Sequence, residues 1–304
     1  MNPHAGADRA LEFVPLINTR LRTLVRELDI TIPVDADDAE RASARAADEG
    51  CDALYVAGGD GTLNAALRGL ASRGAIGNMP IGVIPLGTGN DFAKALGLGE
   101  SPEPALDALL EARVVHVDLG TLNDRPFANT SAGGFIAEVS ESVTEKLKNT
   151  AGKLAYLVGG ARALVGTEPF SARLVVHPGE GPALDSQLDV QLFAVCNARF
   201  IGGGYPIAPS AMIDDGLLDV LVVPRMPMLQ FVSVLQRVSA GQHAEDPSVL
   251  HFRSGAFDLE FDRAVRVNTD GEVLEAVRCH YRVRPRAARF FCGSQPQIHQ
   301  RPRR

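Results

Sequence analysis

The chain has 304 residues, 45% hydrophobic and 22% charged, which is typical of a folded protein of about two domains. Its net charge of -7 argues against nucleic acid as a partner, because nonspecific affinity for nucleic acid comes from Lys and Arg. Its 4 cysteines are widely spaced, which argues against a zinc site or a disulfide scaffold. Since no apolar run approaches the roughly 18 residues of a membrane span, we expect a cytoplasmic protein with transient, peripheral membrane contact at most.

The first third of the chain alternates between helical and strand patterns. The predicted helices cover residues 13–28, 38–49, 63–70, 92–96 and 106–110. The predicted strands cover residues 30–34, 54–57 and 81–86, and Pro33 either places the first of them at a sheet edge or ends it. This alternation predicts an α/β domain with a parallel sheet over residues 1–115.

From about residue 112 the pattern changes to short β-rich runs between Gly, Pro and Asp. The predicted strands cover residues 114–119, 126–129, 173–177, 189–196, 218–223, 257–261, 265–268 and 278–283. Two helices are predicted, over 142–165 and 228–240. The pattern predicts an antiparallel β domain over residues 116–286, a sandwich with a flattened barrel as the alternative, and the last segment, 287–304, could pack back on the first domain. The predicted fold class is therefore α/β plus all-β.

Two glycine-rich loops follow predicted parallel strands, at residues 58–62 and 87–91. Glycine allows the backbone to approach a ligand closely, and ligands of open α/β sheets bind at the carboxyl ends of the strands. Each loop carries one aspartate, Asp60 or Asp91. A carboxylate beside a phosphate site is explained by a bridging Mg²⁺, whereas the alternative is that Asp60 or Thr62 only caps a helix.

Two acidic stretches stand out in the β-rich part. Asp215 lies among glycines and prolines before a strand and could bind Mg²⁺, although an Asp-Gly turn is the simpler alternative. Asp270 and Glu272 flank a glycine where a hairpin turn is equally expected, and one of them could accept a hydroxyl proton. The arginines gathered after residue 277 fit a solvated strand face, with a patch facing anionic lipid headgroups as the alternative.

Taken together, these motifs resemble the diacylglycerol kinase catalytic family, which includes bacterial lipid kinases and sphingosine kinases. The family's N-P-x-S-G is matched by Asn2, Pro3 and Gly6, and its G-G-D-G-T and G-T-G-N-D-F-A by residues 58–62 and 87–93. Its later motifs follow in order at residues 117–120, 129–135, 152–157, 202–220 and 270–272.

The resemblance implies a nucleotide domain like those of phosphofructokinase and NAD kinase, followed by a β-sandwich. It also implies ATP as donor, Mg²⁺, and a lipid hydroxyl as acceptor, most simply that of diacylglycerol. The implied nucleotide contacts are Asn2, Gly6, Gly58, Gly59, Asp60, Gly61, Thr62, Asn64, Gly87, Thr88, Gly89 and Asn90.

Metal and catalytic roles also follow from the resemblance. Asp60 and Asp91 are implied near the catalytic metal, with Asp118 as a network partner. A second, structural Mg²⁺ is implied at the Asp215 carboxylate and the backbone carbonyls of Met212 and Leu217. Glu272 is the first candidate for the proton acceptor, and Asp270 is its competitor.

Three departures from the family pattern bear on function. Ala5 stands where the family has serine, Pro33 falls near a position that is threonine in bacterial relatives, and the strand before N-P-x-S-G is absent, so we expect a late start or a sheet one strand short. The alternatives are a kinase of sphingoid bases or other lipids, an NAD kinase, which the second loop disfavours, and a catalytically impaired regulator. Acceptor and oligomeric state stay open, with a homodimer among the alternatives.

Overall fold

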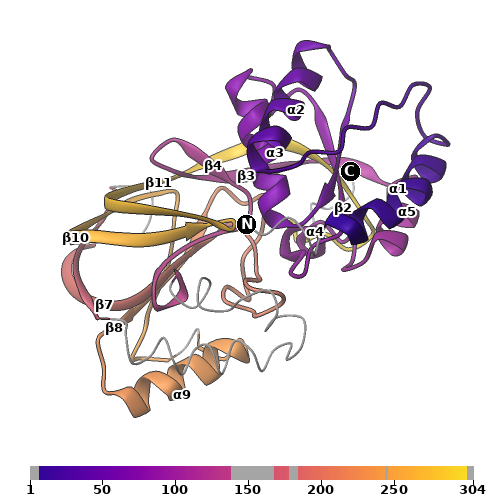
Figure 1. The fold of residues 1–304 in the computed structure, drawn as a ribbon. Coiled ribbons are helices and arrows are strands. Elements are labelled where there is room, and N and C mark those ends of the chain that lie inside the picture. The colour runs from indigo at the N-terminus through magenta and orange to yellow at the C-terminus, as the bar shows by residue number, and fades with distance from the viewer. Residues whose placement is uncertain (1–6, 138–167, 178–183, 244–245, 300–304) are drawn as a thin grey trace.

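The computed structural model describes residues 7–137, 168–177, 184–243 and 246–299 (Figure 1). The predicted nucleotide contacts Asn2 and Gly6, the helix predicted over 142–165 and the motif at 152–157 lie outside these residues.

The first part of the chain forms a layered α/β unit. Its helices are α1 (Ala7–Leu21), α2 (Ala36–Asp48), α3 (Asp60–Ser72), α4 (Asp91–Ala95) and α5 (Pro102–Leu110). The parallel strands β1 (Leu54–Gly58) and β2 (Pro80–Pro85) lie between α2 and α3 on one side and α1 and α5 on the other (Figure 1).

A strand from the far end of the chain completes this sheet. β11 (Glu272–Cys292) pairs in parallel with β2 at Arg289 and Phe290. The Phe290 ring packs edge-on against Phe92, with 5.1 Å between the ring centres. Gly293 and Gln297 then donate backbone hydrogen bonds to the carbonyls of Leu96 and Ala95, so the last described residues lie against α4.

The β-rich part is built from antiparallel strands. They are β3 (Arg113–Leu122), β4 (Arg125–Phe127), β5 (Thr130–Gly134), β6 (Phe170–Val176), β7 (Asp185–Cys196), β8 (Leu218–Pro224), β9 (Leu250–Ser254), β10 (Ala256–Thr269) and β11. Along β7, Phe193 and Val195 pack into the hydrophobic core on one face of the strand. Leu192 packs into a second core on the other face, which includes Phe231 of α9 (Met228–Ser239). This alternation is what a strand covered on both faces requires.

Several predictions of local structure need correction. The strand predicted at 30–34 is wrong, because no element of the described chain pairs with it and its side chains lie in solvent, with Ile30, Ile32 and Val34 exposed by 40%, 55% and 74%. The helix predicted to reach residue 28 ends at Leu21. β5 and β9 were not predicted, and the two strands predicted at 257–268 are one strand, β10, with a register shift.

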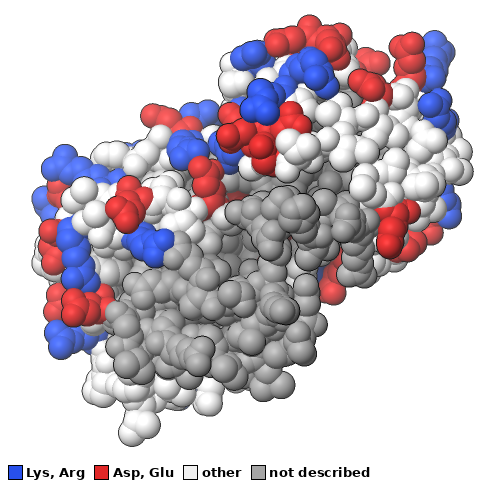
Figure 2. Space-filling model, in the orientation of Figure 1, with Lys and Arg blue, Asp and Glu red and all other residues white. Residues whose placement is uncertain are grey.

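Three of the late arginines within the described residues, Arg278, Arg282 and Arg284, lie in ion pairs on the sheet surface. Arg278 contacts Glu260 at 2.5 Å and Arg282 contacts Asp258 at 2.8 Å. Figure 2 shows basic and acidic side chains intermixed along the upper and left edges of the molecule. This arrangement favours the solvated, ion-paired strand face over a lipid-facing patch. Among the described residues, none of the helices combines the length and the apolar character needed to cross a bilayer.

Candidate active site

The two glycine loops lie side by side at the carboxyl ends of β1 and β2. The Leu86 N–H donates to the Gly58 carbonyl at 3.0 Å. A Cβ atom on Gly87 would lie only 2.6 Å from the Gly59 Cα, so the loops meet at a distance that no side chain could tolerate. The Asn90 side chain fixes the second loop by bonding both the N–H and the carbonyl of Gly87, at 3.0 and 2.7 Å.

Asp60 connects the two loops. It is the first residue of α3, and its carboxylate accepts the N–H groups of Asp91 and Phe92, at 3.1 and 3.0 Å, where α4 begins. The helix-cap alternative is wrong, because α3 is capped by Gly59 without any side-chain bond. Burial raises the pKa of Asp60, and the charge of Asp91 raises it further, so Asp60 lies in an environment that favours a nearby cation.

Asp91 ties the second loop to the β-rich part. Its buried carboxylate receives the Lys94 ammonium at 3.2 Å and the N–H of Gly203 at 2.9 Å. A Cβ atom on Gly204 would lie 3.4 Å from the Lys94 Nζ. Gly203 and Gly204 therefore lie beside the loop at 87–91.

The turn between β10 and β11 reaches the first glycine loop. Asp270 has a positive φ of 47°, and its buried carboxylate accepts the N–H groups of Ala128 and Thr130, at 2.7 and 2.8 Å. Burial raises the pKa of Asp270 to about 7, and the nearby charge of Asp60 contributes to the rise. A Cβ atom on Gly271 would lie 3.8 Å from the Gly61 Cα, so this turn lies beside the loop at 58–62.

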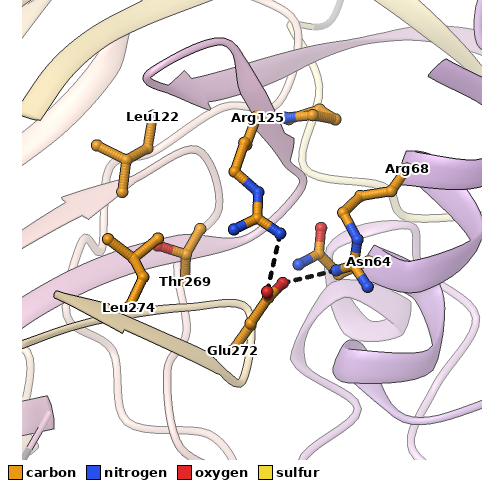
Figure 3. Close-up of a pocket in the computed structure, with 8 residues that line it drawn as sticks. Asn64, Arg68, Leu122, Arg125, Thr269, Glu272 and Leu274 are labelled. Atoms are coloured by element: carbon orange, nitrogen blue, oxygen red, sulfur yellow. Dashed lines mark hydrogen bonds and ion pairs between the residues drawn. The ribbon is translucent and has the colours of Figure 1, made fainter. Parts of the chain in front are cut away.

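Glu272 lies in a different setting, a small pocket between the two parts of the chain. Figure 3 shows its carboxylate between the guanidinium groups of Arg68 and Arg125, each at 2.8 Å. Arg68 also contacts Glu40 of α2 at 2.8 Å. Asn64, a predicted nucleotide contact, lines the same pocket, and its buried Oδ1 has no hydrogen-bond partner among the described residues. Glu272 thus links the β10–β11 turn to the first domain's helices and to β4.

Sequence comparison identifies the chain. Its residues 1–122 match the family model of the diacylglycerol kinase catalytic domain, and residues 130–292 match that of the YegS C-terminal NAD kinase beta sandwich-like domain. The chain belongs to the diacylglycerol kinase family. It is therefore a phosphotransferase with an alcohol acceptor, an ATP-dependent lipid kinase with an N-terminal α/β domain and a β-sandwich.

Relatives in this family align over most of the chain. It is 35% identical to a probable lipid kinase YegS-like of Pseudomonas aeruginosa, over 91% of this chain and 89% of that protein. It is 31% identical to a diacylglycerol kinase of Staphylococcus carnosus, over 89% and 86%. A putative diacylglycerol kinase of Bacillus anthracis has the same fold, with a TM-score of 0.77 and 24% identity over 96% of this chain and 95% of that one.

The structural metal implied by the family resemblance does not fit the residues at its expected place. The Asp215 carboxylate accepts the N–H of Leu217 and contacts the guanidinium of Arg253. Asp118 accepts two backbone N–H groups, from Gly216 and Arg286, both at 2.6 Å. Within the described part of the chain, no cluster of three His, Cys, Asp or Glu side chains could hold a metal ion.

Sequence reasoning missed the cations of this region. The contact of Lys94 could have been predicted, because a Lys three residues after Asp91 on a helix faces that aspartate. Arg68, Arg125 and Arg253 gave no such signal, since each meets its partner from a distant part of the chain.

Proposed function

We propose that this kinase phosphorylates a lipid alcohol, most simply diacylglycerol, at the place where the two glycine loops meet the Asp270 turn. The observation that carries the proposal is the convergence of three acids from separate segments, Asp60, Asp91 and Asp270. A lipid acceptor would be met at a membrane surface, so the protein would make transient peripheral contact with the bilayer.

The nucleotide phosphates would bind along the backbone of the two loops. The amino end of α3 offers N–H groups and the positive end of a helix dipole to an anion. At Gly61 a Cβ atom would have its nearest neighbour at 3.7 Å, so this backbone is not crowded. The close packing of Gly59 on Gly87 keeps the two loops together, and Thr62, Thr88 and Gly89 complete the proposed binding surface.

Asp60 and Asp91 would hold the Mg²⁺. The two carboxylates are adjacent, and the charge of Asp91 opposes ionisation of Asp60. Lys94 is the only cation that contacts either of them among the described residues, and it pairs with Asp91 rather than with Asp60. When bound, Mg²⁺ would offset charge on the phosphate oxygens, and Asp60 would be its first ligand.

Asp270 is the better candidate for the proton acceptor. A general base works best when its pKa lies near the working pH, and burial raises the pKa of Asp270 to about 7. Both carboxylate oxygens of Glu272 are held by guanidinium groups, those of Arg68 and Arg125, so neither oxygen is directed at an acceptor hydroxyl. We therefore assign Glu272 to joining the two domains and Asp270 to the reaction.

A phosphate-transfer assay on a lipid panel tests the proposal. The purified protein is incubated with γ-labelled ATP, Mg²⁺ and micelles of diacylglycerol, monoacylglycerol, sphingosine or ceramide, and labelled lipids are separated. We expect label on diacylglycerol, none with Asp60→Ala, and full activity with Asp107→Ala, which removes an exposed acid of α5. Label on sphingosine alone would reassign the acceptor, and intact ATP binding without any labelled lipid would identify a regulator.

A further inference from the structure

The chain leading into β8 carries an unusual concentration of acids. Asp214 and Asp215 lie just before the strand and Asp219 is within it, and Asp118 of β3 is close enough that the charges of Asp215 and Asp214 help to raise the pKa of Asp118. Asp215 and Asp219 have side chains exposed by only 5% and 2%. Buried carboxylates need compensating charge or hydrogen bonds, so the source of that compensation determines whether this segment needs a metal.

Arg253 supplies the compensating charge for two of these acids. It lies on β9 directly across from Asp219 of β8. Its Nε contacts Asp219 Oδ2 at 3.3 Å, and its Nη2 bonds Asp215 Oδ2. A planar guanidinium can bridge two carboxylates in this way, which a Lys ammonium does less well.

The remaining carboxylate oxygens are satisfied by hydrogen bonds, and the His251 Nε2 lies 3.6 Å from the Asp219 Oδ1. Asp118 accepts the two backbone N–H groups described above. Asp214 accepts the N–H of His299 at 2.7 Å, and the other Asp219 oxygen accepts the Ser210 hydroxyl at 3.2 Å. Of the implied metal ligands, only the backbone carbonyls of Met212 and Leu217 are left, and two neutral oxygens do not make a Mg²⁺ site.

We infer that Arg253 takes the place of a structural divalent cation in this chain. A Mg²⁺ ion at Asp215 would have to displace the guanidinium from that carboxylate and would leave Arg253 without its partner in the acidic segment. The acidic segment, which follows the glycines at 202–204 in the chain, is therefore held to β9 by the Arg253 side chain and does not need a metal ion for this attachment. The inference concerns folding, and it does not depend on which lipid is phosphorylated.

Thermal unfolding of the full chain without nucleotide tests the inference, because its readout does not require activity. Relative to EDTA, millimolar Mg²⁺ should raise the unfolding midpoint of the wild-type protein no more than that of Asp215→Asn. Arg253→Met should lower the midpoint by about 5–10 °C in EDTA, since it leaves two buried acids without their counter-ion, and Mg²⁺ should recover part of that loss. Arg173→Met is the matched control: its ion pair with Asp185 is exposed, so its midpoint should move by about 2 °C or less.

Asp215→Asn identifies where any metal binds and does not require the Arg253 variant to fold. A rise of the wild-type midpoint in Mg²⁺ that disappears in Asp215→Asn would overturn the inference, because the ion would then bind at Asp215. A rise that persists in Asp215→Asn would come from another site and would support it. Equal midpoints for Arg253→Met and Arg173→Met, or no recovery of Arg253→Met in Mg²⁺, would also refute the exchange of one cation for the other.

Discussion

Replacing Asp270 with Asn should remove most turnover while ATP affinity stays near the wild-type value. The amide has nearly the same shape as the carboxylate but cannot accept the proton of the acceptor hydroxyl. General-base assistance is worth typically about 10²- to 10⁴-fold, and we expect a loss of kcat in this range. Because two backbone N–H groups point at each carboxylate oxygen, the amide nitrogen will also face donors, at a cost to stability of about 1–3 kcal/mol.

The same carboxylate predicts the pH dependence. Raising its pKa from 3.8 to about 7 disfavours the charged form by about 4 kcal/mol relative to the neutral form. The wild-type kcat/KM should therefore fall as the pH decreases through about 7, by roughly tenfold per pH unit below it. The contribution of Asp270 to the free energy of unfolding depends on pH in the opposite direction. The folded protein binds this proton more tightly than the unfolded chain does. The stabilisation is therefore complete below the ordinary pKa of an Asp and is lost as the pH rises from about 4 to about 7.

The assay measures initial rates of lipid phosphorylation from pH 5.5 to 9, together with ATP binding and thermal unfolding of each variant. Glu272→Gln is the comparison, because it keeps Asp270 and removes only the charge between Arg68 and Arg125. We expect it to retain the acidic limb of the pH profile. If Asp270→Asn retains turnover and the acidic limb, or if Glu272→Gln alone abolishes both, the assignment of the base is wrong.

Three further predictions concern the loops and the β-sandwich core. Asp60→Ala should abolish turnover and weaken Mg²⁺-dependent ATP binding in equilibrium titrations; unchanged binding would show that the metal lies elsewhere. Gly87→Ala should destabilise the protein by about 1–3 kcal/mol in urea unfolding, because its Cβ would lie 2.6 Å from the neighbouring loop. The control is Gly74→Ala, whose Cβ would meet nothing within 4 Å and which should cost only about 1 kcal/mol for its positive φ. Equal losses of stability in the two variants would contradict the packing argument. Tyr281→Phe should cost about 1–2 kcal/mol in the same assay, since the buried hydroxyl bonds Ser131 at 2.9 Å; no loss would mean that the bond contributes nothing.

The sequence allowed the two-domain fold to be predicted because its signals there are local. Alternating helix and strand patterns end in glycine loops at Gly58 and Gly87, and both loops lie where the rule for parallel strands puts them. The strand at Thr130–Gly134 was missed because its Thr-Ser-Ala-Gly-Gly sequence lacks the β-branched and aromatic residues by which strands are recognised. The segment 30–34 does contain β-branched residues, but no described strand lies alongside it. Without a neighbouring strand its backbone groups have no ladder to join.

The candidate site was predictable in its residues more than in their contacts. Asp60, Asp91 and Asp270 were found through motifs, whereas the choice between Asp270 and Glu272 depends on burial and on two arginines that are distant in the sequence. The pairing of Arg253 with Asp215 likewise follows from the register of β9 on β8. Such registers are set by tertiary packing, which a single sequence specifies only weakly.

The pairing of β11 with β2 has a consequence for the order in which the protein can fold during synthesis. β2 would leave the ribosome about 200 residues before Arg289 and Phe290, which form its parallel partner. Until then one edge of β2 has no strand beside it, and Phe92 lacks the ring that packs on it in the finished protein. Chains generally fold one domain at a time during translation, but here the nucleotide-binding half must wait for the last strand of the other half. The two halves are thus consecutive in sequence but completed together.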